Sequence, residues 1–155
     1  MQVVAPHQVL GVGERGKMFA MDLVDRLRSS IASLPAVRLA VLFGSTARGE
    51  ARSRSDVDLG VLLDPDTRDV RLHVGAELGR AAEREVDLIF LGEAPPLLRF
   101  EISRDGVLLF EREDGLWTDF KVRAMVDWWD WAPYARMFTK AAVQRLRERV
   151  RHGQT

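Results

Sequence analysis

"FGSTARGEARSRSDVDLGVLL" occupies residues 43–63 and joins a glycine-serine pair, a basic loop and two aspartates separated by one residue. Apolar residues follow the aspartates, so residues 57–63 are predicted to form a β-strand. Carboxylates this close repel each other, and strands rarely contain aspartate. A ligand that favours both negative charges is therefore expected at this end of the strand.

Gly44 and Ser45 follow another apolar run, residues 37–43, which also predicts a strand. A short helical piece is expected after them, at residues 46–50. Because Gly44 has no side chain, a phosphate could approach its backbone. The N–H groups at a helix start and the Ser45 hydroxyl could then bind that phosphate. An ordinary strand-to-helix turn capped by serine is the other interpretation, and the glycine-serine pair alone leaves both open.

Asp56 and Asp58 are two residues apart, which places both on the same face of a strand. Asp87 belongs to a third apolar run, residues 86–91, and would add a carboxylate from a neighbouring strand. Three carboxylates on adjacent strands can hold two Mg²⁺ ions roughly 3.5–4 Å apart. The apolar residues that alternate with the first pair are expected to face the core: Val57, Leu59, Val61 and Leu63.

The rest of the chain alternates between helix-like and strand-like segments. Helices are expected at residues 15–33, 69–83, 97–104, 116–130 and 134–151, and strands at 37–43, 57–63, 86–91 and 107–110. Pro133 is expected to kink or break the C-terminal helical region. This order predicts an α/β (α+β) fold with a mixed β-sheet and helices packed on it. We expect a flexible N-terminal arm at 1–17, a core at 18–112 and a C-terminal helical extension of the same domain at 113–155.

The composition narrows the class of protein. The 155 residues fit one domain, and 23 basic residues balance 23 acidic ones, so the overall charge attracts neither nucleic acid nor membrane. Because there is no cysteine, disulfides, thiol catalysis and cysteine-based zinc sites are excluded. No apolar run is long enough to span a bilayer, and no signal-peptide pattern is present. A cytoplasmic protein is expected, without membrane or nucleic acid as a partner.

The stretch at 43–63 resembles the signature G-S-x-A-R-G-x(n)-S-D-x-D-L of minimal nucleotidyltransferases (MNT), a family of the DNA-polymerase-β-like superfamily. The matching positions are Gly44, Ser45, Ala47, Arg48, Gly49, Ser55, Asp56, Asp58 and Leu59. VDLIFL resembles the strand with the family's third carboxylate, here Asp87, and SRDGVLLFE resembles a later I-x-x-x-G-x-x-L-Y-E segment. The resemblance covers roughly residues 20–110 and implies a nucleotidyltransferase-type fold.

The resemblance also implies the substrate and the residues that bind it. A nucleoside triphosphate, usually ATP, would be the donor, and pyrophosphate would leave. Gly44 and Ser45 would hold the β- and γ-phosphates. Arg48 and Ser55 complete the implied nucleotide site, although Arg48 has a second interpretation, in which it braces the loop by pairing with Glu50 or Asp56.

Three aspartates carry the metal and catalytic roles that the resemblance implies. Asp56 and Asp58 would bind two Mg²⁺ ions. Asp87 would bind the ion nearer the acceptor hydroxyl and could help to deprotonate that hydroxyl.

Many members of this family pair with a HEPN ribonuclease toxin and silence it by adding AMP to a tyrosine. The resemblance therefore implies an antitoxin that moves AMP from ATP to a partner HEPN toxin. Two alternatives stay open: an antitoxin that works by contact alone, and a nucleotidyltransferase for small molecules.

The C-terminal segment is rich in tryptophan, with three of the four in WWDW, residues 128–131. On a helix, Phe120, Ala124, Trp128 and Trp131 share one face, and Val122, Met125, Val126 and Trp129 form a second one. One small core does not readily bury both faces. We therefore expect residues 117–138 to bind a helical partner or a second copy of the chain.

Overall fold

The computed structural model describes residues 14–48 and 56–152. Along the chain it contains α1 (Glu14–Ala32), β1 (Val37–Phe43), α2 (Gly44–Ala47), β2 (Val57–Leu63), α3 (Arg68–Ala82), β3 (Val86–Phe90), α4 (Pro96–Asp105), β4 (Val107–Glu111) and α5 (Leu116–His152). All four predicted strands are present, and the α+β class with a mixed sheet is confirmed.

The four strands form one sheet in the order β3-β2-β1-β4. β1 is antiparallel to both β2 and β4, whereas β2 and β3 run parallel, joined by the crossover helix α3. The parallel pairing brings the starts of β2 and β3 to the same edge of the sheet. The antiparallel pairing brings the end of β1 to that edge too, since Phe43 pairs with Asp58.

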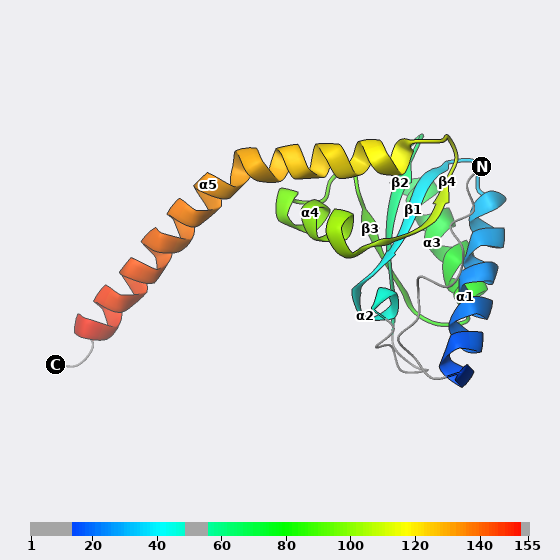
Figure 1. Cartoon of the computed structure of the whole chain (residues 1–155), viewed down its shortest axis with the longest axis horizontal. Coiled ribbons are helices and arrows are strands. Elements are labelled where there is room, and N and C mark those ends of the chain that lie inside the picture. Colours follow the sequence, from blue (N-terminus) through cyan, green and yellow to red (C-terminus); the bar gives the residue numbers. More distant parts are fainter. Residues whose placement is uncertain (1–13, 49–55, 153–155) are drawn as a thin grey trace.

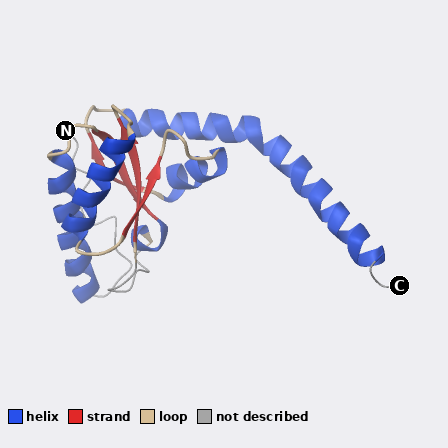
Figure 2. Cartoon of the chain, turned by 180° about the vertical axis from the view of Figure 1, so that it is seen from behind, coloured by secondary structure: helices blue, strands red, loops and turns tan. Residues whose placement is uncertain are grey.

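Helices cover both faces of the sheet, as Figures 1 and 2 show. On one face, α1 and α3 pack over the larger apolar cluster, which contains Leu27 of α1 and Leu78 of α3. On the other face, α4 and the first part of α5 pack over a second cluster. The alternation predicted for β2 is confirmed, because its core-facing residues all belong to the larger cluster: Val57, Leu59, Val61 and Leu63.

Local signals fix the helix ends around the sheet. The Thr67 hydroxyl accepts a hydrogen bond from the Val70 N–H at 3.3 Å, so α3 begins at Arg68, one residue before the predicted start. α4 begins at Pro96, where proline is well tolerated. Gly106 follows α4, and a Cβ there would lie 2.4 Å from the Ile102 carbonyl oxygen. The tight turn from α4 into β4 therefore needs glycine.

The C-terminal helix differs from the prediction of two helices. α5 is a single helix of 37 residues with Pro133 inside it. Figure 1 shows that it changes direction in its orange part, which contains Pro133. Proline removes one backbone hydrogen bond and pushes against the preceding turn, which bends a helix while the bonds on either side continue. The expected kink is present, and the expected break is wrong.

Two further boundaries differ. α1 begins at Glu14, one residue before the predicted start at residue 15, and residues 1–13 of the expected arm lie outside the described residues. α2 begins at Gly44 rather than at residue 46. Among the helices in the described part of the chain, none is sufficiently long and apolar to traverse a membrane.

Candidate active site

The candidate site lies where β1 ends and α2 begins. Gly44 has a backbone φ of +70°, a conformation that residues with a side chain rarely adopt. A Cβ built on Gly44 would lie 2.3 Å from Oδ2 of Asp58. The Asp58 carboxylate therefore lies directly against the Gly44 backbone, and glycine is required both for the turn and for this close approach.

Asp58 and Asp87 are neighbours across the parallel pair β2 and β3. Their Cα positions are register partners, so their side chains project from the same face of the sheet. Asp87 is exposed, as is Asp56 just before β2, and Asp58 is half-buried. The three aspartates therefore lie at one edge of the sheet, and Asp87 does not point into the core.

The electrostatic environment of Asp58 reflects this crowding. Burial raises the pKa of the Asp58 carboxyl, and the negative charges of Asp87 and Asp56 raise it further. Arg48 acts in the opposite direction and lowers it. In the protein without ligand, ionised Asp58 is thus disfavoured relative to an aspartate in water. A cation bound beside Asp58 would relieve that cost.

Arg48 follows α2 and lies near two acidic groups. Arg48 lowers the pKa of Asp58. The pKa of Asp105 is also lowered, mainly by a hydrogen bond from Arg104 and to a smaller extent by the charge of Arg48. A cavity of about 340 Å³ lies beside Arg48 and is lined by Gly44 and by the end of α4, including Arg104 and Asp105. Arg48 therefore lies near α4. The interpretation of Arg48 as a loop brace names only Glu50 and Asp56 as partners and does not involve α4. Glu50, one proposed partner, lies outside the described residues.

Thr46 is a residue of this site that the sequence did not single out. It is buried, and its hydroxyl donates a hydrogen bond to the backbone carbonyl oxygen of Asp56 at 3.3 Å. This bond ties α2 to the start of β2, two segments that residues 49–55 separate in sequence. Its position corresponds to the variable x of the signature, so no motif marks it.

Replacement of Thr46 by valine should lower the free energy of unfolding by about 0.5–1.5 kcal/mol, since it keeps the shape of the side chain but removes one hydrogen bond to a part-buried carbonyl. Urea unfolding of Thr46→Val, compared with Thr46→Ser, measures this. The serine variant keeps the hydroxyl and should lose less. If Thr46→Val were as stable as the wild type while Thr46→Ser lost stability, packing of the methyl group, and not the hydrogen bond, would matter.

The fit of a metal ion to the three aspartates can be tested on their chemistry and position. Carboxylate oxygens are the ligands that Mg²⁺ prefers, and mutual repulsion leaves Asp58 in need of positive charge. Within residues 14–48 and 56–152, no three acidic or histidine side chains are arranged as a ready metal site. Because Asp56 and Asp87 are exposed, their side chains can rotate toward a bound ion. The residues fit Mg²⁺ in kind, and the assembled metal site stays a prediction.

The other predicted site residues divide into two groups. Ser45 is half-buried in α2, immediately after Gly44, where it can reach a ligand of the turn. Ser55 and the arginines of the basic loop lie outside the described residues. The structure therefore brings together Gly44, Ser45, Arg48, Asp56, Asp58 and Asp87 at one edge of the sheet.

Comparison with known protein families gives one match over most of the sheet. The sequence model of a protein family, described as polymerase beta, nucleotidyltransferase, matches residues 25–115 of the chain. This range includes all four strands and every described site residue. A curated relative, the protein adenylyltransferase MntA of Aphanizomenon flos-aquae (strain 2012/KM1/D3), is 23% identical over 107 residues, which are 62% of this chain and 71% of the relative.

Solved structures share the fold. A crystal structure described as a toxin-antitoxin with AMP-PNP has a TM-score of 0.64 at 23% identity, over 75% of this chain and 98% of its own. A structure described as tri-AMPylated Shewanella oneidensis HEPN toxin in complex with MNT antitoxin has a TM-score of 0.59 at 22% identity, over 83% and 98%. At these identities the likeness establishes the arrangement of helices and strands.

Proposed function

The chain belongs to the polymerase β nucleotidyltransferase family, and we propose that it transfers AMP from ATP to a hydroxyl group of a partner protein. The observation that carries this proposal is the placement of Gly44 against Asp58, with Asp87 beside it on the next strand. A phosphate-binding turn next to clustered carboxylates is the arrangement that metal-assisted transfer at phosphorus requires.

The β- and γ-phosphates would bind at the turn. Gly44 has no side chain in the way of a phosphate, Ser45 would supply a hydroxyl donor, and the backbone N–H groups at the start of α2 would donate to the anion. Arg48 would neutralise phosphate charge, and a bound phosphate would compete with Asp58 and Asp105 for its guanidinium group. Ser55 completes the proposed nucleotide site from outside the described residues.

Asp56, Asp58 and Asp87 would hold Mg²⁺, two ions being the proposed number. The metal would supply positive charge for the triphosphate and for the three carboxylates. In the reaction, the acceptor oxygen forms a bond to the α-phosphorus of ATP as the bond to the bridging oxygen breaks, and pyrophosphate leaves. Asp87 is exposed. In this proposal it lies on the side from which the acceptor approaches and would accept the proton of the hydroxyl.

The proposed acceptor is a tyrosine of a HEPN-type toxin, and the chain would act as its antitoxin. Supporting this, the curated relative is a protein adenylyltransferase, and the fold is shared with antitoxins solved together with toxins, one of which carries AMP groups. Neutralisation by contact alone is the second candidate, favoured by the large apolar surface that α5 leaves exposed. A small-molecule acceptor is the third, and no observation on this chain favours it.

Ser45→Ala should weaken binding of MgATP by about 1.5–3 kcal/mol, roughly ten- to hundredfold in Kd, because one hydrogen bond to a charged phosphate is lost. Calorimetric titration with MgATP measures this. Ser29→Ala, which removes an exposed serine of α1 far from the turn, is the matched control and should bind as the wild type does. Equal affinity in the two variants would remove Ser45 from the site.

Catalysis and contact can be separated in cells that express a HEPN-type toxin. An antitoxin that works by AMP transfer should lose its protective effect when Asp58 is replaced by asparagine. Protection by an Asp58→Asn variant that equals protection by the wild type would establish the contact mechanism instead.

A further inference from the structure

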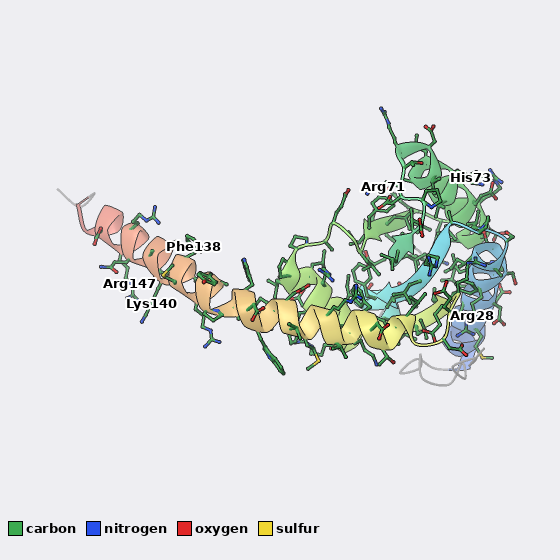
Figure 3. The ribbon with its side chains drawn as sticks, turned by 90° about the horizontal axis from the view of Figure 1, so that it is seen from above. Arg28, Arg71, His73, Phe138, Lys140 and Arg147 are labelled. Carbon is green, nitrogen blue, oxygen red and sulfur yellow. The ribbon has the colours of Figure 1, made fainter. Side chains whose placement is uncertain are left out.

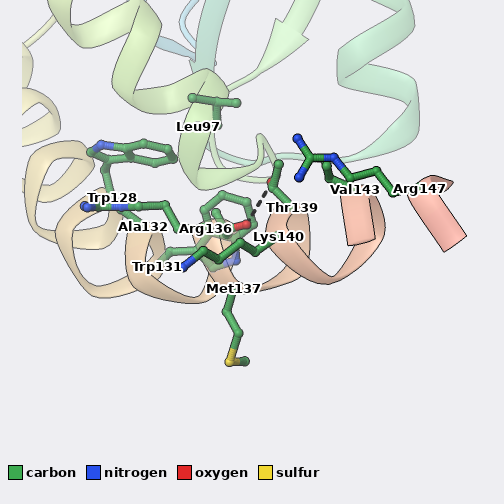
Figure 4. Close-up of a pocket in the computed structure, with 11 residues that line it drawn as sticks. Leu97, Trp128, Trp131, Ala132, Arg136, Met137, Thr139, Lys140, Val143 and Arg147 are labelled. Atoms are coloured by element: carbon green, nitrogen blue, oxygen red, sulfur yellow. Dashed lines mark hydrogen bonds between the residues drawn. The ribbon is translucent and has the colours of Figure 1, made fainter. Parts of the chain in front are cut away.

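The bend of α5 creates a groove that the proposed chemistry does not use. The second half of α5 leaves the body of the protein and bends toward the side on which α4 lies (Figure 1). The concave side encloses a groove of about 1020 Å³ between Leu97 of α4 and α5. Figure 4 shows Leu97 on one wall, with Trp128, Trp131 and Ala132 opposite. The groove is lined mainly by carbon atoms, so it suits an apolar ligand surface.

Within the described part of the chain, little covers this half of α5. Trp131 is 40% exposed and Phe138 is 63% exposed, and Figure 1 shows the C-terminal end of α5 extending away from the other described elements. An isolated helix is only marginally stable in water without a packed face. Exposed apolar area of this extent is typical of a surface that binds another protein.

Every charged side chain that lines the groove in the described part of the chain is basic. The charged side chains that line it are Arg136, Lys140 and Arg147. Figure 3 shows Lys140 and Arg147 on the side of the helix opposite to Phe138. Residues 132–152 hold six basic residues and one acidic residue, a net charge of +5, although the whole chain has a net charge of zero. The groove therefore combines an apolar floor with a positive rim.

This combination favours one kind of occupant over two others. If the same segment of a second copy lay against it, two stretches of charge +5 would repel each other. Nucleic acid would match the arginines, but the apolar floor, which Leu97, Ala132 and the two tryptophans form, offers nothing to phosphates. An amphipathic helix with an apolar ridge and acidic flanks matches both the floor and the rim.

We propose that this groove, which we call the bend groove (Leu97, Trp128, Trp131, Ala132, Arg136 and Lys140), binds an acidic amphipathic helix of the partner protein. The inference rests on the proposed function in taking that partner to be the toxin that is modified. It adds the surface that holds the partner and the chemistry of the segment recognised. Docking at the bend groove would increase the effective concentration of the acceptor hydroxyl near the three aspartates.

Two synthetic peptides test the charge of the occupant. Each has about 18 residues, enough to form a helix, with leucine at every third or fourth position and either glutamate or lysine on the flanks. Fluorescence anisotropy with the full chain should show binding of the glutamate peptide and at least about tenfold weaker binding of the lysine peptide. The double variant Arg136→Glu/Lys140→Glu should reverse this preference. Equal binding of both peptides to the wild type would overturn the inference.

Two tryptophan variants test the position. Trp131 lines the bend groove, whereas Trp129 is 64% exposed outside it, so Trp131→Ala and Trp129→Ala remove the same side chain from adjacent places. Trp131→Ala should weaken binding of the glutamate peptide about thirtyfold, and Trp129→Ala should leave its affinity unchanged. Arg145→Glu is the matched charge control, because Arg145 lies on the same helix but does not line the groove. Equal losses in the two tryptophan variants would place the docking surface elsewhere.

The competing occupants and the proposed function have separate outcomes. A single-stranded RNA that displaces the glutamate peptide, or a dimer in sedimentation that excludes it, would overturn the inference in favour of nucleic acid or a second copy. If the wild type transfers AMP but its peptide binding is unaffected by Trp131→Ala, the inference fails and the proposed function stands. If the groove variants weaken peptide binding as predicted but the wild type transfers no AMP, the docking surface stands and the proposed function fails.

Discussion

Asp58→Asn is expected to reduce AMP transfer at least about a thousandfold, the largest effect of any single substitution in this chain. Loss of one preorganised group that stabilises transition-state charge already costs about 10²–10³ in rate. Asp58 lies against Gly44 and is the register partner of Asp87, so it is at the centre of the proposed metal and phosphate sites. Transfer of label from α-labelled ATP to the partner protein measures the loss.

The same variant should be as stable as the wild type, or more stable, at neutral pH without metal. Burial, Asp87 and Asp56 raise the pKa of Asp58 above its usual 3.8, so the folded state disfavours the ionised form. An acid with a raised pKa binds its proton more tightly when folded, and stability gains as pH falls from above the folded pKa toward 3.8. In urea unfolding, the free energy of unfolding of Asp58→Asn should lack this contribution to its pH dependence. Mg²⁺ should stabilise the wild type more than the variant.

Asp69→Asn provides the matched control, since Asp69 is exposed in the first turn of α3, outside the candidate site. It should keep full transfer activity and the pH dependence of the wild type. Retention of activity by Asp58→Asn would remove Asp58 from the chemistry and with it the catalytic account.

Gly44→Ala should combine a loss of stability with a loss of activity. Alanine at a φ of +70° costs on the order of 1–3 kcal/mol. Its Cβ would also meet Asp58 Oδ2 at 2.3 Å and force that carboxylate away. A displacement of about 1 Å in such a site can cost about a hundredfold in rate. Urea unfolding and the labelled-ATP assay measure the two effects separately.

The control for Gly44 is another glycine. A Cβ on Gly79 of α3 would meet nothing within 4 Å. Gly79→Ala should therefore leave AMP transfer unchanged and stabilise the helix by up to about 1 kcal/mol. If Gly44→Ala behaved in the same way, the close approach of Asp58 to the turn would not matter for function.

The sequence predicted much of the sheet and the site because short-range patterns encode them. Alternation along residues 57–63 determines which side of β2 faces the core, and the same alternation places Asp58 on the other side. The apolar spacing in α5 separated a packed face, with Phe120 and Ala124 buried, from an exposed face that contains Val122 and Trp129. Both predictions follow from the period of the secondary structure alone.

Features that depend on contacts distant in sequence were not predictable. Thr46 meets the carbonyl of Asp56 only because β1 and β2 pair as neighbours, and nothing in its local sequence marks it. The bend groove needs Leu97 of α4 to lie opposite residues 128–147. The continuity of α5 through Pro133 was not predictable either. The local sequence around a proline is the same whether the helix bends there or ends there.

Intact mass spectrometry of a HEPN-type partner, incubated with this chain and MgATP, tests the central claim most directly. The account predicts that the partner gains the mass of one or more AMP groups, that peptide mapping places them on tyrosine, and that neither chelation of Mg²⁺ nor the Asp58→Asn variant permits the gain. A partner that is neutralised by the wild-type chain while its mass stays unchanged would contradict the account.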